Sequence, residues 1–163
     1  MHASRSPRAK IALMPDLAFP GDLPVRLDDG QAQTRIRALM RILHGKIKPA
    51  TRAQIGDVAR WHGVTVKALH NLEERGITVS ERGAGGVRFY AAEQQVRIEV
   101  ALALRELGAT AQDIRDFLEL LTTDRGEARA FLSSVLKRRV TMLHERIGQI
   151  TETLEMIEKD YVL

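Results

Sequence analysis

The sequence predicts a mainly α-helical protein with a small β-hairpin wing, arranged as a winged helix-turn-helix followed by a long C-terminal coiled-coil helix. Three observations lead to this fold class. Two short helical patterns are joined by a glycine turn, a Gly-rich alternating segment comes directly after them, and the C-terminal segment repeats apolar residues at coiled-coil spacing. A chain of 163 residues, 44% of them hydrophobic, suits one such domain with appendages.

The N-terminal segment 1–30 is predicted to be a disordered tail. It holds four of the five prolines, and proline interrupts both helices and strands. The apolar stretch after the first basic residues is broken by Pro15, Asp16 and Pro20, so we expect neither a signal peptide nor a membrane span. The expected location is the cytoplasm, without a membrane partner.

Residues 31–50 are predicted to form a basic amphipathic helix or arm. The segment contains five basic residues and no acidic one, and its apolar residues recur at helical spacing: Ile36, Leu39, Met40 and Leu43. Such a helix could lie along phosphates, on a membrane surface or on its own domain. Docking on its own domain is favoured, because it buries the apolar stripe without another partner.

Residues 51–121 are predicted to form the DNA-binding domain, beginning with a helix-turn-helix. Thr51 and Gln54 have the spacing of a capping box, which predicts a first helix over 52–62. Gly63 then allows a sharp turn, and Thr65 is expected to cap a second helix over 66–74. Two helices alone could be any α–α corner, so the assignment depends on the segment after the second helix.

A wing is predicted directly after the second helix. Residues 77–80 and 87–90 alternate with period two, and the segment 81–86 between them is rich in glycine. Arg82 and Arg88 lie on this hairpin, where they could hold phosphate oxygens by forked hydrogen bonds. The alternative is a structural hairpin with solvated arginines. Two further helices are predicted over 92–107 and 111–121.

The last helix, predicted over 127–161, carries the strongest pattern. Its apolar residues step by four and three: Leu136, Val140, Leu143, Ile147, Ile150, Leu154, Ile157 and Tyr161. These residues define a seam that predicts pairing with a second copy, since no other segment offers a helix of comparable length. Folding back on the preceding helices is the alternative. The expected assembly is a homodimer.

Charge and composition narrow the function further. Residues 1–50 hold nine basic and four acidic residues, whereas residues 91–163 hold ten and thirteen, so the basic front is expected to meet a polyanion such as double-stranded DNA. A basic arm without a partner is the alternative.

The chain has no cysteine, which excludes disulfides, cysteine-bound zinc, iron–sulfur clusters and thiol switches. The scattered histidines form no metal site, and no catalytic motif is present, so neither a cofactor nor an enzyme is expected.

The order of these elements resembles the MerR family of bacterial transcription regulators. The matching strings are IGDVARWHGVTVKALHNLEERGI (55–77), GGVRFY (85–90), LRELGATAQDI (104–114) and the terminal heptad helix. The resemblance implies a dimer, made by antiparallel pairing of the long helices, that binds pseudo-palindromic promoter DNA and distorts it. The metal- and redox-sensing branches use cysteines, so sensing of that kind is not expected.

The resemblance also implies which residues face DNA. Arg88 and Tyr90 correspond to contacts with the DNA backbone, and Lys67 corresponds to a contact from the recognition helix. His70 and Asn71 stand where the family usually has Arg and Tyr, so they carry over as positions only. The full set of predicted DNA-binding residues is Thr65, Lys67, His70, Asn71, Arg82, Arg88 and Tyr90.

Because the departures fall at the DNA face, a second function stays open. In that alternative the chain is an interaction or architectural protein that keeps the fold, reads DNA weakly, and binds RNA polymerase or another protein through residues 1–50.

Overall fold

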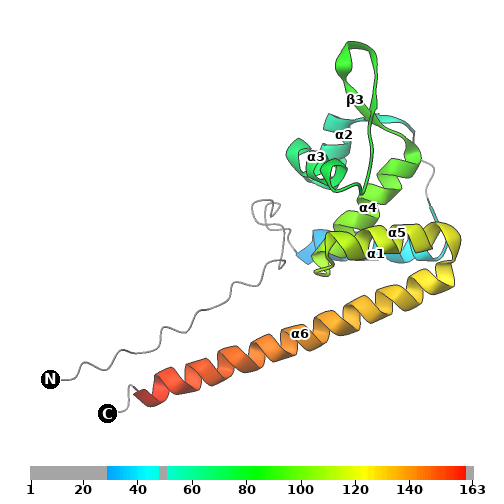
Figure 1. The fold of residues 1–163 in the computed structure, drawn as a ribbon. Helices are drawn as coiled ribbons and strands as arrows, with labels where there is room; N and C mark the ends of the chain where they lie inside the picture. The colour runs from blue at the N-terminus through cyan, green and yellow to red at the C-terminus, as the bar shows by residue number, and fades with distance from the viewer. Residues whose placement is uncertain (1–28, 48–50, 161–163) are drawn as a thin grey trace.

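The computed structural model describes residues 29–47 and 51–160, and Figure 1 shows their arrangement. The helices and strands follow one another as α1 (Asp29–Leu43), β1 (Ala53–Gln54), α2 (Ile55–His62), α3 (Val66–Glu74), β2 (Glu81–Arg82), β3 (Arg88–Tyr90), α4 (Ala92–Glu106), α5 (Ala111–Thr123) and α6 (Arg125–Asp160), with a 3₁₀ turn over Ala84–Gly86. The predicted fold class is confirmed. Most of the predicted tail and Tyr161 lie outside the described residues.

The small sheet has three strands rather than the predicted two. β3 lies in the middle and pairs antiparallel with β2 on one side and with β1 on the other. β1 takes residues that the sequence assigned to the first helix, so the capping box at Thr51 is wrong. The structure uses the backbone of Thr51 instead, because its carbonyl oxygen accepts a hydrogen bond from Gln95 Nε2 at 2.6 Å.

The predicted strand over residues 77–80 is also wrong, because α4 satisfies its backbone groups. Arg97 Nε donates to the carbonyl oxygen of Ile77 at 2.7 Å, and Gln94 Oε1 accepts from the amide of Val79 at 3.0 Å. A strand partner is therefore not needed there. The hairpin pairs only over β2 and β3.

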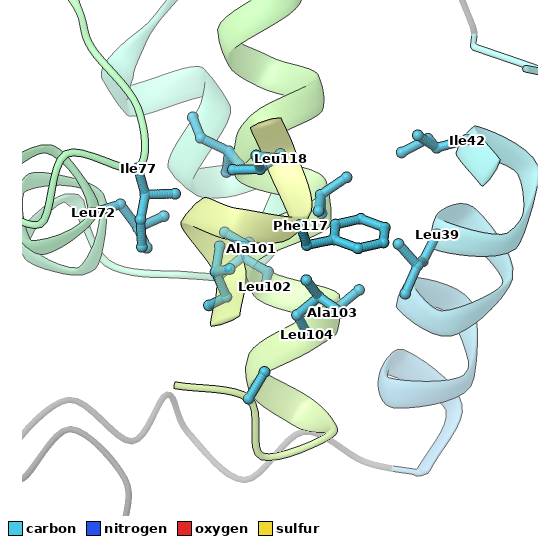
Figure 2. Close-up of a cluster of buried hydrophobic side chains, with 14 of the residues drawn as sticks. Leu39, Ile42, Leu72, Ile77, Ala101, Leu102, Ala103, Leu104, Phe117 and Leu118 are labelled. Carbon is cyan, nitrogen blue, oxygen red and sulfur yellow. The ribbon is translucent and has the colours of Figure 1, made fainter. Parts of the chain in front are cut away.

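One hydrophobic core joins α1 to the helices of residues 51–121. Figure 2 shows Leu39 of α1 next to Phe117 of α5, with the α4 residues Ala101, Leu102, Ala103 and Leu104 close by. Phe117 and Leu39 are each 1% exposed. The apolar stripe of α1 is thus buried on its own domain, as the sequence favoured, although Met40 stays 47% exposed and Ile42 takes its place inside.

A buried arginine fixes α1 in this position. Arg35 Nη1 lies 2.7 Å from Glu106 Oε1 at the end of α4, and Arg35 Nη2 donates to the carbonyl oxygen of His62 at 2.7 Å. Burial lowers the pKa of Arg35, and the contact with Glu106 opposes this shift only in part. Burial, and to a smaller extent the nearby guanidinium of Arg35, also lower the pKa of His62, which favours the neutral imidazole.

Replacing Arg35 with Met should therefore loosen α1. The substitution leaves Glu106 and the carbonyl of His62 without their partner, so we expect the free energy of unfolding to fall by about 2 kcal/mol. Urea denaturation measures this change. Arg37→Met is the matched control, because Arg37 is exposed on the same helix. Equal effects of the two substitutions would contradict an anchoring role for Arg35.

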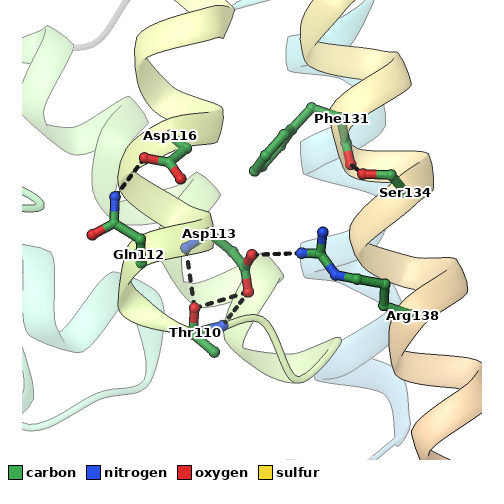
Figure 3. A network of polar contacts seen from close by, with 7 residues as sticks. All are labelled: Thr110, Gln112, Asp113, Asp116, Phe131, Ser134 and Arg138. Carbon is green, nitrogen blue, oxygen red and sulfur yellow. Dashed lines mark hydrogen bonds and ion pairs between the residues drawn. The ribbon is translucent and has the colours of Figure 1, made fainter.

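The first half of the long helix α6 packs against α5. Figure 3 shows the capping box at the start of α5, where Asp113 Oδ2 accepts from the amide and the hydroxyl of Thr110. The other oxygen, Oδ1, lies 3.0 Å from Arg138 Nη2 of α6. The second half of α6 extends away from the domain in Figure 1. No helix within residues 29–47 and 51–160 is long and apolar enough to cross a membrane.

Candidate nucleic-acid interface

The helix-turn-helix forms as the local sequence predicts. Gly63 ends α2 in the left-handed conformation, with φ 60°, which lets the chain turn sharply before α3 begins at Val66. Thr65 caps α3, since its Oγ1 accepts from the amide of Ala68 at 3.1 Å. The predicted DNA-binding residue Thr65 is exposed at the start of α3. Its hydroxyl is used by the cap.

The outer face of α3 is mixed in charge. Lys67 and Glu74 are exposed, whereas His70 and Asn71 are half-buried, and the inner face packs through Ala68, Leu69 and Leu72. Val66, at the start of the helix, is 39% exposed. Lys67 is thus the basic residue that this outer face presents. The amide of Asn71 can donate and accept hydrogen bonds beside it.

The wing places two arginines directly opposite each other. The register of β2 and β3 pairs Arg82 with Arg88, and opposite residues of an antiparallel pair share one face of the sheet. Like charges in this position repel each other. Arg82 is exposed, and the side chain of Arg88 is 34% exposed. This face therefore concentrates positive charge at the surface.

The opposite face of the wing is built from residues that sequence reasoning missed. The guanidinium of Arg52 lies 4.0 Å above the centre of the Phe89 ring, and Arg52 Nε is 3.3 Å from Glu81 Oε2. A Cβ on Gly83 would come within 2.6 Å of the Phe89 ring, so only glycine fits at this corner of the tip. These contacts stiffen the wing. Only the pairing of β1 with β3 brings them together, and no local pattern indicates it.

Glu73 joins the end of α3 to the wing. Its Oε1 accepts from the hydroxyl of Tyr90 at 2.9 Å, and its Oε2 lies 3.6 Å from Arg88 Nε. The side chain of Glu73 is therefore held by two contacts rather than free in solvent. One carboxylate thus sets the position of α3 relative to the cationic face of the wing.

The DNA contact predicted for Tyr90 needs correction. Tyr90 is 0% exposed, and burial together with the hydrogen bond to Glu73 raises the pKa of its phenol. A buried hydroxyl that already donates to a carboxylate is not available to a phosphate oxygen. Tyr90 is instead a positioning residue that holds Glu73.

Replacing Tyr90 with Phe should destabilise the domain. The substitution removes the hydroxyl and keeps the ring, so we expect a loss of about 1.5–3 kcal/mol in the free energy of unfolding, typical of a hydrogen bond to a charged acceptor. Urea denaturation of Y90F, E73Q and the double variant tests the pair. Losses that simply add in the double variant would show that the two side chains are not coupled.

The seam predicted for the last helix is exposed along the outer half of α6. Leu136 packs partly against the core, whereas the following seam residues are 46–59% exposed: Val140, Leu143, Ile147, Ile150, Leu154 and Ile157. The alternative that the helix folds back on α4 and α5 is not what the structure has beyond Leu136. Among the residues described, no group of three or more His, Cys, Asp or Glu could hold a metal ion.

Comparison with known proteins identifies relatives for most of this domain. Residues 53–121 match the family described as MerR HTH family regulatory protein. The Nodulation protein NolA of Bradyrhizobium elkanii is 36% identical over 108 residues, which cover 64% of this chain and 49% of that protein. The HTH-type transcriptional activator TipA of Streptomyces coelicolor is 32% identical over 106 residues, covering 64% of this chain and 39% of TipA.

A shorter relative aligns over more of its length. The HTH-type transcriptional regulator HmrR of Rhizobium leguminosarum bv. viciae is 27% identical over 104 residues, covering 64% of this chain and 80% of HmrR. The chain spans about half the length of the NolA proteins it matches. No solved structure gives a significant match.

Proposed function

We propose that this chain, in which residues 53–121 form a MerR-family helix-turn-helix domain, is a transcriptional regulator that binds double-stranded DNA as a homodimer. The relatives named as a transcriptional activator and a transcriptional regulator support a regulatory rather than an enzymatic role. A protein with this role acts where bacterial promoters are, in the cytoplasm.

The observation that carries the proposal is the paired arginines of the wing. Arg82 and Arg88 lie opposite each other on one face of the wing, and the carboxylate of Glu73 beside Arg88 offsets only part of their charge, so a polyanion would meet a positive face here. Through Glu73 the same face is tied to α3, whose Lys67 is exposed. A phosphate backbone could contact the wing while α3 enters the major groove. In this proposal Arg82, Arg88 and Lys67 contact DNA, with Thr65, His70 and Asn71 beside them.

The proposed dimer forms along the exposed seam of α6. Six large apolar residues, each about half exposed in one chain, would leave water if a second α6 packed on them. Their four-three spacing suits the packing of a two-helix coiled coil.

Charge favours the antiparallel arrangement of the two helices. Residues 125–144 hold five basic residues and one acidic residue, whereas residues 145–160 hold two basic and five acidic residues. Antiparallel pairing places the basic half of each helix on the acidic half of the other, and parallel pairing places like charges together. Two helix-turn-helix domains would then lie at opposite ends of the coiled coil, as a pseudo-palindromic site requires.

We further propose that the dimer distorts promoter DNA. Two wings and two recognition helices fixed to one rigid coiled coil impose their own spacing on the duplex, and the duplex must bend or untwist to meet both. With no cysteine in the chain, control by thiol-bound metals or by thiol oxidation is not part of this proposal.

The proposal is tested by selecting bound fragments from sheared genomic DNA of the host at about 150 mM salt, which screens loose phosphate contacts. Sequencing of the retained fragments should recover one inverted-repeat motif lying in promoters. Featureless enrichment would contradict the proposal and favour the interaction protein. The site for a protein partner would then be sought in residues 1–50. Within this segment, the apolar face of α1 is already buried on the domain.

A further inference from the structure

A groove lies between α1 and the first half of α6. Its volume is about 590 Å³, and it is lined mainly by apolar side chains: Met40, Leu43, Leu132, Leu136 and Val140. Leu43 and Leu132 form the buried floor, whereas Met40 and Val140 are 47% and 51% exposed at the rims. The two walls are tied together, because Arg129 Nη2 donates to the carbonyl oxygen of Leu43 at 3.0 Å.

The groove is continuous with the seam of α6. Leu136 and Val140 are its first two seam residues, and both line the groove. A helix that packed along the seam would therefore run into the groove and meet α1. Met40 stands at that point, and methionine adapts well to irregular apolar partners. α1 lies outside the residues matched to the family, so the family match does not account for this groove.

We propose that this groove receives the C-terminal end of α6 from a second copy of the chain. The inference rests on the antiparallel dimer proposed above. Ile147 is the middle residue of the seam. When two antiparallel helices are aligned on this residue, Leu136 faces the partner subunit's Ile157, and Val140 faces the partner subunit's Leu154. α1 then acts as a third helix that clamps the end of the partner's α6.

Charge at the rim fits this occupant. Arg129 and Lys137 line the groove, and the end of α6 carries Glu152, Glu155, Glu158 and Asp160. Lys137 directly follows the seam residue Leu136, and Glu158 directly follows Ile157. In the antiparallel alignment Lys137 and the partner subunit's Glu158 flank the same pair of seam residues, which suits an ion pair between the helices.

Cysteine cross-linking tests the inference directly, because the chain has no cysteine of its own. M40C and I157C chains are mixed, allowed to exchange subunits and oxidised. We expect a disulfide-linked dimer from the mixture and none from either variant alone. A disulfide between positions 40 and 157 must join two chains. Within one chain, Ile157 lies about 26 Å along α6 from Val140, the residue that lines the groove with Met40. Q33C mixed with I157C is the matched control, because Gln33 is exposed on α1 and does not line the groove.

The outcomes separate this inference from the proposed dimer. I147C, at the middle of the seam, should link to its own copy in any dimer centred there. Linked I147C without a link between M40C and I157C would overturn the clamp and leave the dimer, with the groove open to an apolar ligand or another segment. A link of I157C to itself would indicate parallel helices and overturn both. A monomer by light scattering would also overturn both.

A second measurement tests the energetic role of Met40. M40E should weaken dimerisation roughly tenfold or more, because the groove would have to bury a carboxylate against apolar side chains. Q33E should leave dimerisation unchanged. Equal dissociation constants for M40E and the unsubstituted chain would contradict the clamp.

Discussion

Replacing Ile147 with Asp is expected to separate the dimer into monomers and to remove tight binding to an inverted-repeat site. Ile147 lies at the middle of the seam and is 59% exposed in the single chain, so the substitution should leave the fold of each chain intact. In an antiparallel pair the two copies of this residue lie close to the two-fold axis. The variant would therefore bury two carboxylates side by side, at a cost of several kcal/mol.

The loss of DNA binding results from the loss of the link between two half-sites. When one domain of a dimer is bound, the second binds at a high effective concentration, which typically adds a factor of roughly 10²–10⁴ to the overall affinity. Monomers lose this factor. Light scattering measures the mass in solution, and fluorescence anisotropy with a labelled site measures the affinity.

The matched control for Ile147 is Gln149→Asp, which places the same charge on an exposed position outside the seam. Its mass and affinity should be unchanged. An I147D variant that keeps the mass of a dimer would show that the chains do not pair along this seam.

Replacing Arg82 with Glu is expected to lower the affinity for DNA about a hundredfold. The dimer carries the substitution twice, and each lost phosphate contact is worth roughly 1–1.5 kcal/mol in a charge-assisted hydrogen bond. The loss should be similar for all DNA sequences, because a phosphate contact carries no base information. The slope of the logarithm of affinity against the logarithm of salt concentration should fall by about two for Arg82→Ala.

Arg82 is the clearer test because its exposed side chain can change without disturbing the fold. Arg88→Glu should lose as much affinity, but it also sets a second carboxylate against Glu73 and so needs a parallel stability measurement. Arg37→Glu makes the same change in net charge at an exposed position of α1, a helix that lies far from the wing in Figure 1, and serves as the control. If R82E and R37E bound DNA equally, the wing would not be the phosphate contact.

Local chemistry made the helix-turn-helix predictable. The predicted bounds of α3, 66–74, agree with the structure because Thr65 supplies a cap at one end and the glycine after Arg75 allows a turn at the other. The long helix was equally clear, since its apolar spacing needs no knowledge of the rest of the fold. Docking of α1 came from the same reasoning about a stripe that must be covered.

Contacts between distant segments were not predictable. The strand β1 depends on pairing with β3 across more than thirty residues, so its two residues looked like the start of a helix. Residues 77–80 alternate like a strand, but side chains of α4 satisfy them. The roles of Tyr90, Glu73 and Arg52 likewise arise only when α3 and the three strands meet.

The central claim is that two chains, joined through α6, hold two wings on one DNA site. The most direct measurement is the mass of the protein–DNA complex, determined by light scattering. Two duplexes are compared: one carries the inverted repeat recovered from genomic DNA, and the other carries a single half-site. We predict two chains on each inverted repeat and an affinity for the half-site at least roughly a hundredfold lower. One chain on each duplex, with equal affinity for both, would contradict the claim.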